Sequence, residues 1–208
     1  MQFENVKQLL KPLIKKGQEW QFIDINGNDK KPKYYFSDVQ WVIIFTCIGS
    51  QFQLTIGLSG DVVGYIMSAF SISVSLFMSL LVSIFDKFEN TDLSLRNTTD
   101  EDEIRLIHKK NFFKRFISIT SYLVILSIFI IILCSLTYFF NTNNEISYHY
   151  FTVQWNEIDV LTTVRNILIL LYRCTLYYFL LTYLFLTLFV AGSAYEYYIS
   201  EIDRRKIK

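Results

Sequence analysis

The sequence lacks most of the residues and motifs on which enzyme active sites are built. It contains only two histidines, His108 and His149, and neither a glycine-rich phosphate loop nor a serine nucleophile motif. The two histidines fall on opposite sides of the membrane domain predicted below, so no histidine-based metal site or catalytic triad can form within one chain. We therefore expect a protein that is not an enzyme, with no catalytic residue, no metal site and no cofactor.

Cysteine is scarce as well. Cys47, Cys134 and Cys174 are odd in number, and each lies inside an apolar run rather than in a loop. This placement argues against a disulfide framework. We expect all three to be small buried hydrophobic residues.

Long apolar stretches are what the sequence has in abundance. The stretch from Val62 to Phe85 contains no charged residue. At about 1.5 Å per residue it is long enough to cross a bilayer core of about 30 Å. With three further stretches, it predicts an all-α membrane protein with four transmembrane helices, in a domain over residues 38–190 with spans near 38–57, 62–85, 114–140 and 164–190.

The positive charges predict how these spans are oriented. Apart from Arg165 and Arg173, every Lys and Arg lies within residues 1–40, 86–115 or 204–208. Cytoplasmic segments of membrane proteins carry the excess of Lys and Arg. We therefore expect a multi-pass protein of the cell (inner or plasma) membrane, with three cytoplasmic parts: the N-terminal segment 1–37, the loop 86–113 and the tail 191–208.

The N-terminal segment carries two local patterns. Residues 1–16 have apolar side chains at helical spacing with lysines alongside, which is typical of an amphipathic helix on a membrane surface or of a soluble cap. Pro12 predicts a kink there, or two short pieces. Asn26-Gly27, between segments rich in aromatic and β-branched residues, predicts a β-hairpin with a type I′ turn. Asp38 is the expected N-cap of the first span, with Trp41 at the interface.

The second span has small residues on one face. At about 100° per residue these positions share one side of the helix. In one interpretation this face lets helices of several copies pack closely, with the hydroxyls bonded one turn back or to a neighbouring helix. In the other, several copies place the hydroxyls around a water-filled path, a pore lined by Ser68, Ser71, Ser75 and Ser79. The face comprises Gly64, Ser68, Ser71, Ser75, Ser79 and Ser83.

Polar side chains inside the predicted membrane domain form a second candidate site. Arg173 has three interpretations: it reaches the outer headgroups, it pairs with a polar group on another helix, or it responds to a ligand, an anion or the voltage. Buried amides also need partners, so the glutamines of the first span should face a helix or a polar cavity. The predicted intramembrane polar cluster is Gln51, Gln53, Asp61, Arg165 and Arg173.

The charged stretch before the third span is the third candidate. Acidic residues just after Thr98 and Thr99 predict a helix start, and a helix could run unbroken from about residue 99 into the third span. Acids followed by bases also suit a simple solvated face. Because basic residues are interspersed with acids, direct nucleic-acid binding is not expected. The candidate docking surface for a soluble partner is Asp100, Glu101, Asp102, Glu103, Arg105, Lys109 and Lys110.

The plan of four spans in about 200 residues, with charged cytoplasmic segments and no catalytic residues, resembles the small membrane subunits of bacterial antiviral defence systems, such as the Kiwa-type membrane component. The resemblance is carried by the spans near 38–57, 62–85, 114–140 and 164–190 and by a composition rich in Ile, Asn, Lys and Phe. It implies a membrane-bound scaffold or sensor that detects disturbance at the envelope and recruits a cytoplasmic effector.

Together these patterns predict a non-enzymatic homo-oligomer that is embedded in membrane lipid and docks a soluble cytoplasmic protein. The alternative is a pore-forming or channel protein lined by the serine face of the second span.

Overall fold

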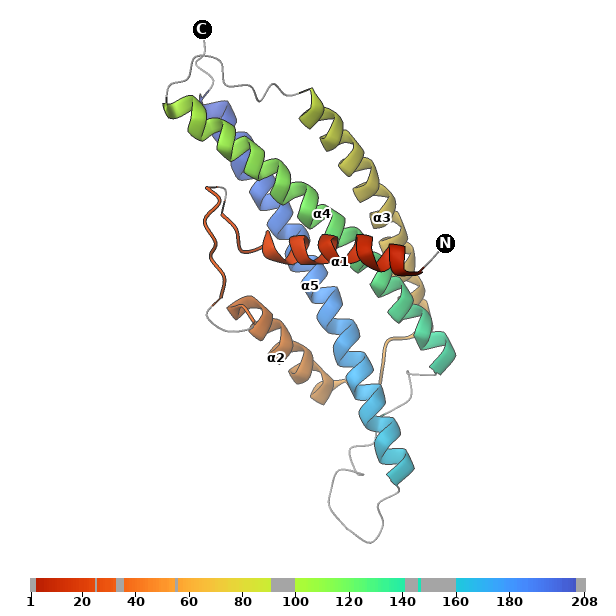
Figure 1. The fold of residues 1–208 in the computed structure, drawn as a ribbon. Coiled ribbons are helices and arrows are strands. Elements are labelled where there is room, and N and C mark those ends of the chain that lie inside the picture. Colours follow the sequence, from red (N-terminus) through yellow and green to blue (C-terminus); the bar gives the residue numbers. More distant parts are fainter. Residues whose placement is uncertain are drawn as a thin grey trace. The chain divides into compact units, whose positions relative to one another are not determined.

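The computed structural model describes residues 3–24, 26–32, 36–54, 56–90, 100–140, 146 and 160–204 (Figure 1). Every regular element in this described part is a helix, and no strand occurs in it. The all-α class predicted from the sequence is therefore confirmed. The helices are α1 (Phe3–Glu19), α2 (Asp38–Gln53), α3 (Gly60–Glu89), α4 (Asp100–Phe140) and α5 (Val160–Arg204).

Three of the described helices are long and apolar enough to cross a membrane: α3, α4 and α5. By contrast, α2 has 16 residues, which is about 24 Å of helix and shorter than a bilayer core of about 30 Å. The predicted span 38–57 is thus too long, because α2 ends at Gln53 and Leu54 has an extended backbone. The sequence after Leu54 is Thr-Ile-Gly, and these residues are weak helix formers.

The other helices are longer than the predicted spans. The segment 86–113 is not a simple loop, because α3 continues to Glu89 and α4 begins at Asp100. The prediction of one unbroken helix from about residue 99 into the third span is confirmed. The predicted tail 191–208 is helical as far as Arg204, since α5 meets no proline there.

The contacts divide the chain into two compact units, and the first comprises residues 36–72 and 127–183. In this unit α3 packs on α5 through the rings of Phe70 and Tyr183, whose centres are 4.6 Å apart. The Tyr138 hydroxyl of α4 donates a hydrogen bond to the Gly60 carbonyl at the start of α3, with a length of 3.0 Å. Aromatic contacts and hydroxyl hydrogen bonds thus hold its helices together.

The second unit comprises residues 1–35, 73–126 and 184–208. Its core lies along α4, where Ile119, Thr120 and Leu123 are at most 1% exposed. Beyond them, Phe112 of α4 stacks on Tyr197 of α5 with ring centres 3.9 Å apart and an interplanar angle of 8°. Large aromatic rings therefore supply much of the apolar surface that this unit buries.

Helix α1 runs through Pro12 as a single element, so the prediction of two short pieces is wrong. It belongs to the second unit and crosses α4 (Figure 1). The crossing is close at Gly17, which is buried: a Cβ atom there would lie 2.4 Å from the Tyr122 Cβ and 3.1 Å from the Ser118 carbonyl oxygen. Only glycine allows the two helix backbones to approach this closely.

The predicted hairpin around Asn26-Gly27 is present only as a chain reversal. One isolated bridge joins Ile23 and Asp29, and no strand occurs among the described residues. The Asp24 amide donates to the Asn28 carbonyl at 2.9 Å, so three residues form the loop rather than the two of a type I′ turn. Gly27 has φ = 84°, which fits the left-handed position at the end of such a loop.

The N-cap of α2 is Ser37, not Asp38 as predicted. The Ser37 hydroxyl accepts from the Gln40 amide at 3.3 Å, and the Gln40 side-chain oxygen accepts from the Ser37 amide at 2.9 Å. This reciprocal pair is a capping box, in which glutamine three residues after the cap completes the second bond. The sequence signal for it, Ser37 followed by Gln40, was available but overlooked.

Candidate functional site

Five of the six residues on the small-residue face of α3 are exposed, while Gly64 is partly buried and a Cβ there would lie 3.6 Å from the Tyr138 hydroxyl oxygen of α4. Ser68, Ser71, Ser75, Ser79 and Ser83 are all exposed. The contacts that α3 makes with its own chain use bulkier residues on other sides, such as Val63, which is fully buried, and Ile84, at 9% exposure. These serines therefore form a stripe of small side chains that the described part of the chain leaves exposed.

The serine hydroxyls are largely satisfied within α3 itself. Ser68 donates to the Gly64 carbonyl at 3.0 Å, Ser71 to the Met67 carbonyl at 2.8 Å, and Ser79 to the Ser75 carbonyl at 3.1 Å. These bonds reach one turn back, as the packing interpretation predicted. Because the donors are already used, this face is less polar than its composition indicates.

The structure separates the predicted intramembrane polar cluster into buried and exposed members. Gln51 is 3% exposed and Arg173 is 4% exposed, whereas Gln53, Asp61 and Arg165 are exposed. Arg173 is thus enclosed by protein. Asn166 on α5, at 7% exposure, is a further buried polar residue.

A cavity of about 10 Å³ adjoins Arg173, which is room for about one water molecule. One wall comes from the segment between α2 and α3, and the others come from α4 and α5. The Tyr172 hydroxyl shares a 2.8 Å hydrogen bond with the Thr137 hydroxyl and also donates to the Leu133 carbonyl. The lining residues are Gly57, Leu58, Thr137, Tyr172, Arg173, Leu176 and Tyr177.

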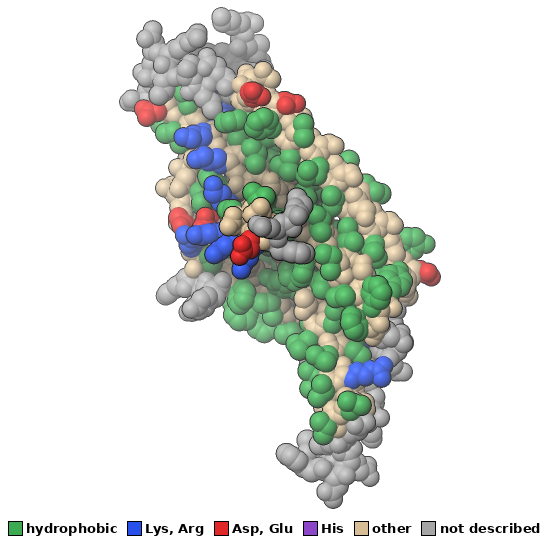
Figure 2. Space-filling view, turned by 45° about the vertical axis from the view of Figure 1, so that its right-hand side comes forward, with side chains coloured by type: hydrophobic (Ala, Val, Ile, Leu, Met, Phe, Trp, Pro, Cys, Tyr) green, Lys and Arg blue, Asp and Glu red, His purple; other side chains and the backbone are tan. Residues whose placement is uncertain are grey.

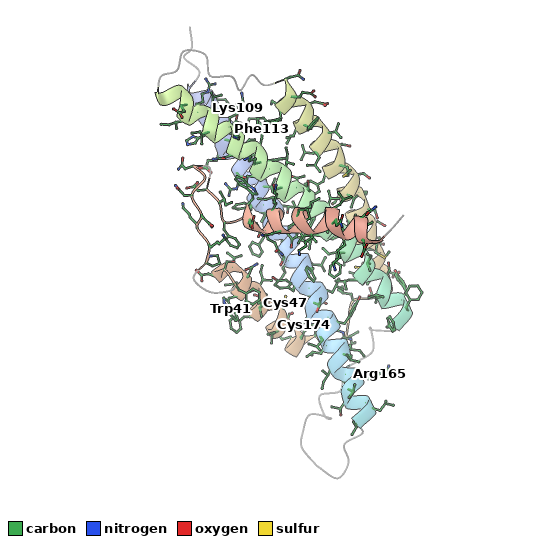
Figure 3. The ribbon with its side chains drawn as sticks, in the orientation of Figure 1. Trp41, Cys47, Lys109, Phe113, Arg165 and Cys174 are labelled. Atoms are coloured by element: carbon green, nitrogen blue, oxygen red, sulfur yellow. The ribbon has the colours of Figure 1, made fainter. Side chains whose placement is uncertain are left out.

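The neighbourhood of Arg173 also includes two thiols. Cys47 of α2 lies close to Cys174 of α5 (Figure 3). The three cysteines are all free, with Cys47 and Cys134 buried and Cys174 partly buried. Gln51 follows Cys47 by one helical turn, and Cys174 directly follows Arg173, so both thiols lie near buried polar residues of the same unit.

Arg165 belongs to a different feature of the same unit, an open apolar groove of about 480 Å³ between α4 and α5. Among the described residues that line the groove, this arginine is the only charged one. Arg165 and Arg173, two turns apart in the sequence, therefore have opposite environments, one exposed beside apolar surface and one enclosed. The remaining lining residues are Leu136, Phe140, Leu161, Val164, Leu168, Ile169 and Tyr172.

The candidate docking surface lies on the first turns of α4. Glu103, Arg105 and Lys110 are exposed, and Lys109 is partly buried. The side chains of Asp100, Glu101 and Asp102 lie outside the described residues. Between the charges, Ile104 is 51% exposed and Ile107 is 44% exposed. Glu103, Ile107, Lys110 and Lys114 recur at helical spacing on one side of α4, so this outward face combines apolar and charged side chains.

The opposite side of the same helix segment is held by aromatic and cationic contacts. Phe112 and Phe113 are each 5% exposed. The Arg115 guanidinium lies 4.3 Å from the centre of the Phe189 ring, and the Lys87 ammonium lies 5.4 Å from that of Tyr198. Such cation–π contacts tie the ends of α3, α4 and α5 to one another.

The N-terminal segment is tied to α4 at a second point. His108 Nε2 lies 2.5 Å from the Asn26 side-chain oxygen, within hydrogen-bond distance. Ion pairs brace the same segment: Lys30 with Asp24 at 3.1 Å and Lys31 with Asp29 at 2.6 Å. The hydrogen bond that Lys31 donates to the Asp29 carboxylate, together with the negative charge of that carboxylate, raises the pKa of Lys31, but both partners are solvent-exposed. The pair therefore adds little stability.

Sequence reasoning missed the residues that fix these contacts. Gly17 carried a signal, because it is a glycine within the apolar face of an amphipathic helix. Phe112 and Arg115 carried none, since nothing local indicates which ring or charge meets a distant helix. The described residues contain no group of three or more His, Cys, Asp or Glu placed to hold a metal ion.

No protein-family model and no curated protein matches the sequence, and no solved structure matches the fold. The function therefore has to be inferred from the residues of this chain.

Proposed function

We propose that this chain is a non-enzymatic, oligomeric scaffold or sensor of the cell membrane that recruits a soluble cytoplasmic protein, in a role such as antiviral defence. The observation that carries the proposal is the length of α4. Its 41 residues amount to about 60 Å of helix, twice a bilayer core of about 30 Å. A helix of this length with a charged first half projects well beyond the membrane on the lysine-rich side.

The outward face of that projection supports protein docking. Ile104 and Ile107 are exposed on it beside Glu103 and Lys110. Apolar side chains rimmed by charges on an aqueous surface are typical of a protein interface. On the surface seen in Figure 2, most Lys and Arg side chains gather on the left, a further one lies apart near the lower end, and hydrophobic side chains cover much of the remainder. We place docking on the charged first turns of α4 and lipid contact along the apolar parts of α3, α4 and α5.

The docking face is tested by exchanging its charges, Glu103→Lys with Lys110→Glu, which keeps the net charge. We expect the chain in native nanodiscs to carry one soluble protein in fixed ratio and the exchanged variant to lose it by at least about tenfold, because like charges then face the partner. Native mass spectrometry measures both the partner and the copy number of the chain. A matched exchange on α1, Glu4→Lys with Lys7→Glu, should retain the partner. Equal capture by both variants would refute this docking face.

The proposal includes four spans, with α2 as the first and both termini in the cytoplasm. The Lys and Arg distribution supports this, and so does Trp41, 42% exposed and stacked on Phe45 at the start of α2 like an interfacial anchor. We expect a fluorescent reporter that folds only in the cytoplasm to be active at either terminus, and one inserted between α4 and α5 to be inactive. Activity at one terminus only would mean three spans, and α2 would then not cross.

A pore remains the second candidate function, and the exposed serine face of α3 favours it, since copies could meet there around a central path. Against it stand the bonds from Ser68, Ser71 and Ser79 to their own helix carbonyls. One experiment distinguishes the scaffold or sensor from the pore. If the chain forms a homo-oligomer that carries no soluble partner and conducts ions in a planar bilayer, the pore is favoured.

A further inference from the structure

Helix α1 buries only one end of its apolar face. Near its C-terminal end, Gly17 is buried against α4 and Leu13 and Ile14 are partly buried. Toward the N-terminal end Leu9 is 73% exposed, and Val6 and Leu10 are each 38% exposed. The contact with α4 therefore leaves leucine surface on α1 that needs another environment.

The two flanks of α1 differ in chemistry. Lys7, Lys11 and Lys15 recur every four residues along one flank and are exposed. Leu9 lies on the other flank, since at about 100° per residue it is about 160° from Lys11 and Lys7. The side between the flanks contacts α4 at Gly17. A helix with Lys7, Lys11 and Lys15 on one flank and Leu9 beside Lys16 on the other, held sideways against a spanning helix, suits a membrane interface.

The position along α4 at which α1 makes contact also suits a membrane interface. Figure 1 shows α1 running across α4, and the contact lies at Ser118 and Tyr122. From Tyr122 to the end of α4 at Phe140 the helix is about 28 Å long, close to the thickness of one bilayer core of about 30 Å. If the hydrocarbon begins at Tyr122, α1 lies in the headgroup layer and Lys114 and Arg115 lie outside the core.

We propose that α1 binds anionic phospholipid in the cytoplasmic leaflet, and that its Gly17 contact sets the hydrocarbon boundary of α4 near Tyr122. Leu9 enters the acyl boundary, while the lysines meet the anionic headgroups. The proposal rests on the membrane-spanning placement of α4 but not on the docked partner. It moves the cytoplasmic end of the third span from residue 114 to about 122, which lengthens the part of α4 available to a partner.

The test places an environment-sensitive fluorophore on a cysteine at Leu9 or, as the matched control, at Gln18, after Cys47, Cys134 and Cys174 are replaced by alanine. Gln18 is exposed and two and a half turns away, so it lies on the opposite side of the same helix. In nanodiscs of phosphatidylcholine with phosphatidylglycerol, we expect a several-fold lower quenching by aqueous iodide at position 9 than at position 18. Lipid-borne quenchers should show the reverse order.

Removing charge should weaken the shielding at position 9. Each lysine near an anionic surface contributes about a fivefold factor to binding, so nanodiscs of phosphatidylcholine alone, or the Lys7→Gln and Lys11→Gln variants, should raise iodide quenching there. Equal iodide access at both positions in anionic nanodiscs would overturn the proposal. Shielding at position 9 that persists in a lipid-free polymer belt would mean that a second copy covers it, which would overturn it as well. Neither result changes the reporter test of topology or the partner-capture test.

Discussion

Replacing Gly17 by alanine should detach α1 from α4. The added Cβ would lie 2.4 Å from the Tyr122 Cβ and 3.1 Å from the Ser118 carbonyl oxygen, and neither atom can move without shifting a helix. Overpacking of this kind costs about 1–3 kcal/mol, which corresponds to an increase of about 5–150-fold in the equilibrium constant for opening the contact. Hydrogen–deuterium exchange of residues 3–19 in nanodiscs measures that opening.

The matched control is Gly192→Ala on α5. Both glycines lie inside helices, so alanine raises the intrinsic helix propensity by about 1 kcal/mol at each. No side chain or backbone atom lies within 4 Å of a Cβ at Gly192. The control should therefore leave the exchange of α1 unchanged, and the difference between the variants isolates the steric effect. An unchanged α1 in the Gly17→Ala variant would show that the close crossing does not form.

Phe112→Ala should loosen the second unit at the charged ends of α4 and α5. Phe112 is 5% exposed, stacks on Tyr197 and also contacts Phe113 and Phe116 with ring centres 5.8 Å away in each case. Truncating a buried phenylalanine costs about 3–5 kcal/mol, because the cavity is only partly refilled. We expect residues 184–204 to exchange faster and to be cleaved sooner by protease.

Ile104→Ala is the control for that substitution. Ile104 lies on the same helix segment but is 51% exposed, so its removal should change stability by less than about 0.5 kcal/mol. If protease cleaves both variants at the same rate, the aromatic contacts do not hold these helix ends. Phe112→Tyr retains the ring. If this variant is as resistant to protease as the original chain, the faster cleavage of Phe112→Ala results from lost stacking and packing.

Features that depend on local sequence were predicted well. The start of α4 at Asp100 followed from a run of acids at a helix N-terminus, and its unbroken course followed from apolar residues without proline. The backward bonds of Ser68, Ser71 and Ser79 also followed from spacing, since a hydroxyl reaches a carbonyl one turn back in any helix. Local geometry suffices for each of these, whatever the helix packs against.

Local errors came from competing signals of similar strength. Asp38 and Ser37 are both good caps, and only the bond from Gln40 decided for Ser37. Asn26-Gly27 fits a two-residue turn, but pairing of Asp24 with Asn28 produced a three-residue loop. Pro12 was expected to kink α1 or to divide it into two pieces, and the division does not occur: one helix continues through it and packs Gly17 on α4. Tertiary contact can outweigh a local preference of a few kcal/mol.

The sequence by itself determined that this chain is all-helical and has helices long and apolar enough to cross a membrane, because length, hydropathy and periodicity are properties of consecutive residues. Only the tertiary structure decided which faces those helices bury. It enclosed Arg173 but left Arg165 beside a groove, turned the serine face of α3 outward, and brought Gly17 against Tyr122. These outcomes depend on the shapes of side chains that lie far apart in the sequence. No short stretch of sequence contains both residues of such a contact.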